Sequence, residues 1–228
     1  RNPRAQNLRI SPPVTDHKVH NDEHNGFIRK RSCQDHLQSL SCIAETRMLN
    51  NLDTFVSFID FSKAYDRIPH NHLWYKLSKL GIHGKILSAI QSLYTGVTCH
   101  VRVNNCLSEV FDVKCGLKQG CLNSPLMFNM YINDLITEIN LLDRGISING
   151  KKVSMLLYAD DIVFVAKCTR DLQCMLDVLN KWCKDWALQV NPSKSKIMHC
   201  RKNGCKLTRF PFKCGAHELE VVKKHRYL

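Results

Sequence analysis

The chain has few acidic residues for its size. Its 228 residues include 20 Asp and Glu against 33 Lys and Arg, which gives a formal net charge of +13. This deficit of negative charge favours a polyanionic partner, with nucleic acid as the first candidate and an anionic membrane surface as the second. A basic surface that only aids solubility is the plain alternative. With 44% hydrophobic residues, the chain can still form a sizeable core.

The sequence also lacks long apolar runs, a recognisable signal peptide and C-x-x-C pairs. No run approaches the roughly 20 residues of a membrane span, so we expect no membrane partner. Several of the twelve cysteines, such as Cys99, Cys183 and Cys200, fall in apolar stretches. We therefore expect reduced, buried thiols in an intracellular protein. A zinc site is the alternative for four residues whose spacing matches no known finger: Cys200, Cys205, Cys214 and His217.

Hydrophobic periodicity predicts the helices. Residues 1–25 show no period and contain three prolines, which indicates a loop or an arm. Ser124 is predicted to be an N-cap, followed by Pro125 at the first helical position. Apolar residues recur at helical spacing in five segments: 32–49, 70–82, 84–94, 124–142 and 171–188.

Alternating or continuous apolar residues predict the strands. A strand over 55–60 ends at Asp60, and residues 97–113 form a hairpin that turns at Asn104 and Asn105. A second, more apolar hairpin covers 156–167, and short basic strands close the chain. Helices mixed with hairpins favour an α+β fold with helices packed on one face of an antiparallel sheet.

The second hairpin, LLYADDIVFVAK, carries Asp160 and Asp161 at its expected tip. Burying an unpaired carboxylate costs on the order of several kcal/mol of folding free energy. A simple turn is one explanation, because Asp is common in turns, although two-residue hairpin turns prefer Asn-Gly or Asp-Gly. A divalent cation is the other, since its charge offsets the repulsion between the carboxylates.

Asp60 supplies a third carboxylate at the end of a strand, where it would face the hairpin across the sheet. Magnesium is usually held by one or two carboxylates with substrate phosphates, and a two-metal centre needs a further acid. Asp66 competes for this role, but we expect it to cap the helix that begins near Pro69. Two strand-terminal acid sites in a basic chain favour metal-assisted phosphoryl transfer on nucleic acid.

Four segments resemble the palm motifs of reverse transcriptases in their order and approximate spacing. They are FIDFSKAYD, CGLKQGCLNSPLMFNMYINDL, LLYADDIVFVAK and LQVNPSKSKIM, and they are most similar to those of non-LTR (LINE-type) retrotransposons. The resemblance implies a right-hand polymerase fold, with an N-terminal arm and partial fingers over 1–52 and a palm over 53–228. The palm would carry a fingers-side insertion around 82–115 and would end at the primer-grip region, without a thumb.

The same resemblance implies an RNA-directed DNA polymerase that extends a primer 3′-hydroxyl with dNTPs. Asp60, Asp160 and Asp161 would be the catalytic residues and would hold two Mg²⁺ ions, with Mn²⁺ as a substitute. The Phe61 carbonyl would be a further metal ligand. One ion would assist the attack on the α-phosphate, and the other would stabilise the leaving pyrophosphate.

Further positions would bind the substrates. Tyr65 would exclude ribonucleotides, with a core aromatic role as the alternative. Gln119 and Gly120 would lie against the incoming nucleotide and the template. Lys194 would lie near the pyrophosphate, with Lys196 as the alternative. An RNA template and a DNA primer are the implied partners, in the cytoplasm or nucleus.

The sequence departs from the family pattern in the fingers. In GFIRKRS, Ile28 replaces the first arginine of the usual G-F-R-x-x-R-S, whereas Arg31 keeps its place and remains a substrate-binding candidate. Leu122 and Asn123 replace a proline or leucine followed by leucine. The alternative function is therefore a truncated or decayed, inactive domain that at most binds nucleic acid.

Overall fold

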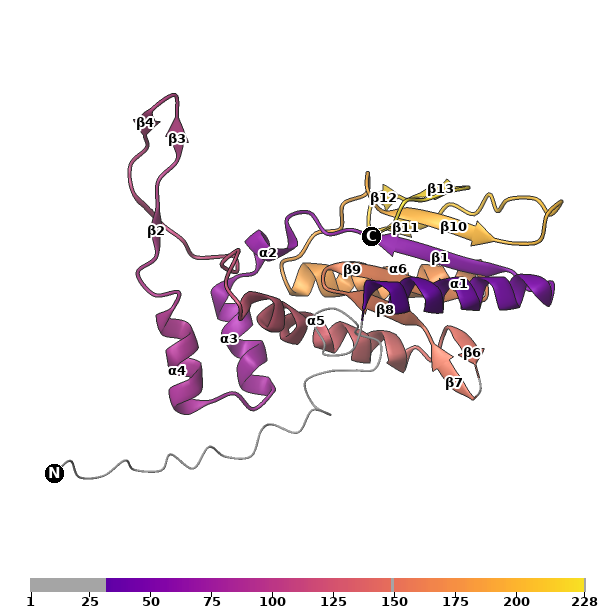
Figure 1. The fold of residues 1–228 in the computed structure, drawn as a ribbon, viewed down its shortest axis with the longest axis horizontal. Coiled ribbons are helices and arrows are strands. Elements are labelled where there is room, and N and C mark those ends of the chain that lie inside the picture. The colour runs from indigo at the N-terminus through magenta and orange to yellow at the C-terminus, as the bar shows by residue number, and fades with distance from the viewer. Residues whose placement is uncertain (1–31, 149, 228) are drawn as a thin grey trace.

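The computed structural model describes residues 32–148 and 150–227 (Figure 1). The predicted N-terminal arm and Arg31 lie outside the described residues. Among the helices of the described part, none is both long and apolar enough to cross a membrane.

A five-stranded sheet forms the centre of the molecule, in the order β13-β10-β1-β9-β8. The middle strand β1 (Thr54–Ile59) pairs antiparallel with β9 (Asp161–Ala166) and with β10 (Lys196–Cys200). The edge strands are β8 (Met155–Tyr158) and β13 (Glu220–Val222). Because β13 runs parallel to β10, the sheet is mixed, and the prediction of a purely antiparallel sheet is wrong at this edge.

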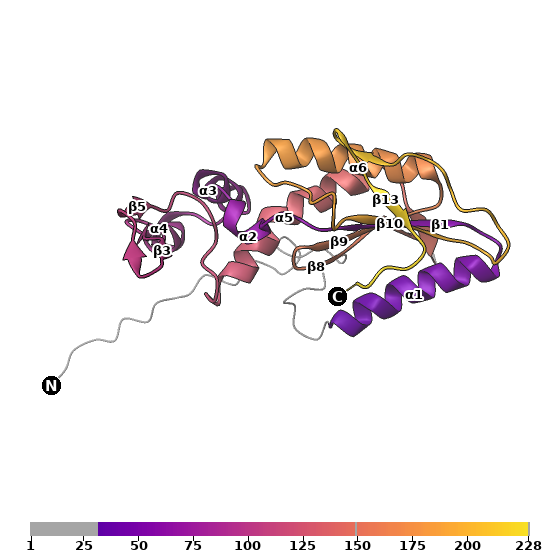
Figure 2. The ribbon, with the colours of Figure 1, turned by 90° about the horizontal axis from the view of Figure 1, so that it is seen from above.

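Helices cover both faces of the sheet (Figure 2). The helices α5 (Ser124–Leu141) and α6 (Thr169–Asp185) pack on one face, and α1 (Cys33–Leu49) packs on the other. Every residue of β1 is buried, because its side chains alternate between two covered faces. The prediction that helices pack on one face is therefore wrong for α1. Val56 and Val163 belong to a second, smaller core beneath α1, which buries the apolar side chains on that face of the sheet.

A separate arm projects from the sheet on the side of α2 (Ala64–Arg67) (Figure 1). Its helix α3 (His70–Lys79) packs against α5 through Leu73 and Leu77, both fully buried. Asn104 and Asn105 adopt φ of 47° and 65°, the left-handed values that a two-residue hairpin turn needs, so this predicted turn is confirmed. The arm consists of α3 (His70–Lys79), α4 (Gly84–Ser92), β2 (Thr98–Cys99), β3 (Arg102–Val103), β4 (Cys106–Leu107) and β5 (Phe111–Asp112). The remaining elements are α2 (Ala64–Arg67), β6 (Ile146–Ile148), β7 (Lys151–Val153), β11 (Lys213–Cys214) and β12 (His217–Glu218).

Two predicted helix caps are wrong. Ser124 is the first residue of α5, and its hydroxyl donates to the Lys118 carbonyl at 2.6 Å, while Asn123 takes the cap position. Asp66 does not cap α3, which has Pro69 at its cap position. Its carboxylate instead accepts a hydrogen bond from Gln119 Nε2 at 3.1 Å. Both side chains are used by tertiary partners that a local pattern does not show.

The thiols are less buried than expected. Cys183 and Cys214 are buried, Cys200 is half-buried, and Cys99 is exposed on the projecting arm, as are Cys42, Cys106, Cys115 and Cys205. The expectation of burial is therefore wrong for Cys99, because its hairpin leaves the core.

Candidate active site

Asp60 directly follows β1 and is held by the loop 189–195. The Asn191 amide donates to the Asp60 carbonyl at 2.8 Å, and the Asp60 amide donates to Ser195 Oγ at 3.1 Å. Asp60 Oδ2 lies 3.9 Å from Lys194 Nζ. Its other oxygen, Oδ1, is buried and has no hydrogen-bond partner among the described residues. A buried acceptor without a partner is costly, so this atom is a candidate ligand for a cation.

Asp160 and Asp161 come from the β8–β9 hairpin. The turn is formed by Ala159, at φ 56°, and Asp160, while Asp161 is the first residue of β9 and pairs with Tyr158. The predicted tip is thus displaced by one residue. Since Ile162 pairs with Ile59, the same register continued by one residue brings Asp161 opposite Asp60. Such cross-strand neighbours have Cβ atoms about 5 Å apart.

Burial and neighbouring carboxylates raise the pKa of Asp160 and of Asp161. Burial, then the charges of Asp160 and Asp60, raise the pKa of Asp161 to about 6. Burial and Asp60 also raise the pKa of Asp160, against the opposing effects of a backbone hydrogen bond and Lys194. The repulsion that the sequence predicts is therefore present, and a bound cation would relieve it.

Asp60 and Asp161 line one pocket of about 350 Å³, together with Lys194, Lys196 and the segment 225–227. Lys194 is 69% exposed and lies next to Asp60, whereas Lys196 forms an ion pair with Glu220 at 2.8 Å. Of the two lysine candidates, Lys194 thus has the more exposed and less constrained ammonium.

A second pocket, of about 630 Å³, is lined by Tyr65, Gln119 and Gly120. The Tyr65 ring stacks on Phe128 with centroids 4.8 Å apart, so it has both a packing role and a face toward the pocket. Burial, then the charge of Asp160, raise its pKa to about 12. Asp160 therefore acts electrostatically on both the carboxylate edge and the second pocket.

Gly116 allows the segment before Gln119 to approach α2 closely. Its φ is 94°, and an added Cβ would lie 3.1 Å from the Asp66 carbonyl oxygen. The neighbouring Leu117 amide donates to the Tyr65 carbonyl at 2.7 Å. A glycine is therefore needed here to align Gln119 with Tyr65.

The Phe61 carbonyl is available for a ligand role. Phe61 forms an isolated bridge with Val190, but the bridging bonds use the Asp60 carbonyl and the Ser62 amide. The Phe61 carbonyl itself is outside this bridge. Its side chain is buried, so the backbone at this position is well supported.

The sequence reasoning missed a buried histidine beside the carboxylate pocket. His36 on α1 is fully buried, and its Nε2 lies 3.1 Å from the hydroxyl of Tyr227, which lines the pocket. Burial and the charge of Asp161 raise the pKa of Tyr227. A single polar residue inside a helix pattern gave no signal for His36.

Within residues 32–148 and 150–227, no group of three or more His, Cys, Asp or Glu side chains is arranged as a metal cluster. Asp60 and Asp161 line a pocket instead, and two carboxylates are compatible with Mg²⁺ because that ion keeps several water and substrate ligands. The carboxylate donor set and the unpartnered Asp60 oxygen fit such a hard cation.

The sequence model of the family described as reverse transcriptase (RNA-dependent DNA polymerase) matches residues 4–228. The chain is 28% identical over 193 residues to a probable RNA-directed DNA polymerase from transposon BS of Drosophila melanogaster, covering 82% of this chain and 21% of that protein. It is 25% identical over 175 residues to the RNA-directed DNA polymerase from mobile element jockey of the same species, covering 74% of this chain and 19% of that protein. The chain thus spans about a fifth of these curated relatives.

Solved structures show a similar fold. A telomerase from Candida tropicalis, in complex with a TWJ fragment of telomeric RNA, superposes with a TM-score of 0.60 at 15% identity. The match covers 83% of this chain and 32% of that one. At this identity the similarity concerns the fold alone.

Proposed function

The chain belongs to the reverse transcriptase (RNA-dependent DNA polymerase) family, and on that premise we propose that it carries the nucleotidyl-transfer centre of a non-LTR retrotransposon polymerase. The reaction is the template-directed addition of dNTPs to a primer 3′-hydroxyl. In this proposal residues 53–228 form the palm, 82–115 form a fingers-side insertion, and 1–52 contribute to the fingers.

One observation carries the proposal. Asp60 and Asp161 come from adjacent strands and line the same pocket, and one Asp60 oxygen is buried without a partner in the described chain. An ordinary surface acid would be solvated, and an ordinary buried acid would have a hydrogen-bond donor. A cation held between the carboxylates would explain why Asp60 and Asp161 share one pocket and why the buried Asp60 oxygen has no donor in the described chain.

Asp60, Asp160, Asp161 and the Phe61 carbonyl would hold the metal. When bound, two Mg²⁺ ions supply the positive charge that activates the primer hydroxyl and stabilises the pyrophosphate. Lys194, whose Nζ lies 3.9 Å from Asp60, would bind the phosphates of the dNTP from the solvent side. Its flexible stem and exposed ammonium suit it to a ligand that enters and leaves.

Tyr65, Gln119 and Gly120 would position the nucleotide. They line one pocket, and Asp160 acts on Tyr65 through its charge. A ring fixed against Phe128 would occupy the space of a ribose 2′-hydroxyl. The Gln119 amide is oriented by its bond to Asp66, so it would present a fixed surface to the base pair.

Primer extension on an RNA template tests the proposal. We expect Mg²⁺-dependent addition of dNTPs by the wild type and loss of addition in Asp160→Asn. Asp112→Asn, a matched change on the exposed β5 strand, should retain activity. Normal binding of template and primer by the wild type without any addition would contradict the proposal and favour a decayed, nucleic-acid-binding domain.

A further inference from the structure

A basic loop, residues 201–210, lies at the end of the sheet opposite to Asp60. It follows β10, whose last residue Cys200 pairs with Thr54 at the start of β1. Asp60 is six residues further along the same extended segment. At about 3.3 Å per residue, the basic loop begins roughly 20 Å from the carboxylate edge. It is therefore a separate surface.

The basic loop has no acidic residue to balance it. Residues 186–217 contain seven Lys and Arg and no Asp or Glu, and four of the seven lie in the basic loop: Arg201, Lys202, Lys206 and Arg209. Among the described residues, none of these four forms an ion pair. Uncompensated cations on one loop produce a local positive potential.

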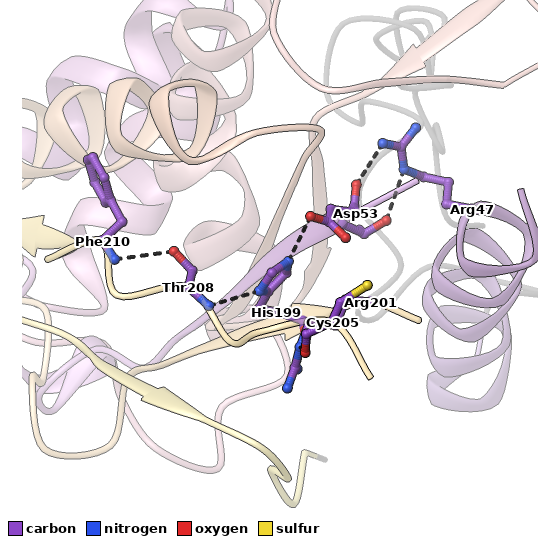
Figure 3. Close-up of polar contacts among 8 residues, drawn as sticks. Arg47, Asp53, His199, Arg201, Cys205, Thr208 and Phe210 are labelled. Carbon is purple, nitrogen blue, oxygen red and sulfur yellow. Dashed lines mark hydrogen bonds and ion pairs between the residues drawn. The ribbon is translucent and has the colours of Figure 1, made fainter. Parts of the chain in front are cut away.

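His199 holds the basic loop in a defined conformation (Figure 3). The Thr208 amide donates to His199 Nδ1 at 3.1 Å, so this nitrogen carries no proton. The other ring nitrogen, Nε2, lies 3.2 Å from Asp53 Oδ2. The buried ring also stacks on Phe55 at 4.3 Å. A loop ordered before binding loses less conformational entropy when a ligand arrives.

Two of the four basic side chains stabilise the loop itself, and the other two are free to contact a ligand. Arg201 Nε donates to the Cys205 carbonyl at 2.7 Å, and Lys202 Nζ donates to Asn51 Oδ1 at 2.9 Å, so both brace the basic loop. Lys206 and Arg209 are exposed and have no hydrogen-bond partner for their side chains in the described part of the chain. Beside Arg209, the Phe210 ring is 36% exposed and rests on Phe212 at 4.8 Å.

We propose that the basic loop binds a single-stranded segment of nucleic acid outside the catalytic edge. Lys206 and Arg209 contact backbone phosphates, and the supported Phe210 ring stacks on a base. Cations beside an exposed aromatic ring suit single strands, whose unstacked bases offer their faces. A duplex keeps its bases stacked, and so it would use the charges but not the ring. The inference concerns binding and does not depend on catalytic turnover.

The test compares Lys206→Ala/Arg209→Ala with Lys151→Ala/Arg170→Ala. The control pair removes the same two charges from exposed positions elsewhere. Binding of primer–template duplexes with single-stranded extensions of about 4 or about 16 nucleotides is measured by fluorescence anisotropy at several salt concentrations. RNA and DNA extensions are tested in parallel, and circular dichroism melts confirm that each variant folds.

With the long extension, the loop variant should reduce the magnitude of the negative slope of log K against log salt by about 1.4, because two single-strand phosphate contacts are lost. The control pair and the short extension should show no such change. Phe210→Leu should weaken binding of the long extension about tenfold and leave blunt-duplex binding unaltered. Equal effects of both double variants would overturn the proposal, as would equal effects of the loop variant on the long and the short extension.

Discussion

The Asp60 amide donates a hydrogen bond to the Ser195 hydroxyl at 3.1 Å, across 135 residues of sequence. Ser195 is fully buried, and its own amide donates to the Asn191 carbonyl at 2.9 Å. This contact joins the strand end that carries a candidate metal ligand to the loop that carries Lys194. The Ser195 hydroxyl therefore ties the proposed metal ligand Asp60 to the loop that carries the proposed phosphate contact Lys194.

Ser195→Ala should lower both stability and activity. The Asp60 amide would lose its acceptor in a buried place, which costs about 1 to 3 kcal/mol of unfolding free energy. Chemical denaturation measures this loss, and primer extension should show a reduced rate because Asp60 is less well held. Ser41→Ala, on the exposed face of α1, should change neither quantity. An unchanged denaturation midpoint in Ser195→Ala would contradict the positioning role.

Asp161 should make metal-free stability depend on pH. Its folded pKa of about 6 exceeds the ordinary 3.8, so the folded state binds this proton more tightly than the unfolded state does. The stabilisation is therefore complete below pH 4 and is lost as the pH rises toward and through 6. Asp161→Asn should remove that fall and, without metal, be more stable than the wild type at pH 7, by on the order of 1 kcal/mol because solvent screens a half-exposed carboxylate.

The same pair of proteins tests metal binding. Mg²⁺ should raise the melting temperature of the wild type at pH 7, because binding to the folded state stabilises it, and a chelator should reverse the increase. Asp161→Asn should respond more weakly. Identical responses of the two proteins to Mg²⁺ would exclude Asp161 from the metal site.

Tyr65→Ala should allow incorporation of ribonucleotides. The stacked ring would no longer fill the space beside the sugar, so discrimination between dNTPs and rNTPs should fall about 10- to 100-fold. Tyr65→Phe keeps the ring on Phe128 and should keep the discrimination. Single-nucleotide incorporation with each substrate gives the two values of kcat/KM. Equal discrimination in the alanine variant and the wild type would leave only the packing role.

Lys76 should stabilise the junction between the arm and the sheet layer. Its ammonium donates to the Tyr131 carbonyl at 2.6 Å and to Asp134 at 2.7 Å, and lies 3.7 Å from the centre of the Trp186 ring. Lys76→Met should lower the free energy of unfolding by about 2 kcal/mol, because these contacts are lost. The loss is no larger because Asp134 is 41% exposed and can be rehydrated. Lys79→Met, one turn away and exposed, is the control in urea denaturation. A smaller loss in Lys76→Met than in Lys79→Met would be inconsistent with this role.

Local patterns in the sequence predicted much of the framework. The amphipathic segment that became α6 has its apolar residues fully buried, from Leu172 to Trp182. The strand before Asp60 and the hairpin around Asp160 are where the runs of apolar residues predicted them. These features depend on neighbours a few positions away, so periodicity is sufficient to find them.

Side chains whose partners lie outside their own helix or strand were predicted less well. Ser124 and Asp66 looked like helix caps, since both types favour that position, yet Lys118 and Gln119 provide their actual partners. His36 carried no signal because its partner, Tyr227, is 191 residues away. The packing of α1 on the second face of the sheet was not predicted, because a continuous apolar run shows that a strand is buried but not which elements cover each of its faces.

The sequence alone determined that three acids occupy strand ends in a basic chain, and that the apolar flanks of those acids form strands. Only the tertiary structure decided which groups meet. Sheet order brings β9 beside β1, so that Asp161 lies opposite Asp60, and the return of the chain along β10 brings Ser195 to the same edge. Strand order arises from the packing of the whole core, to which residues far apart in the chain contribute together.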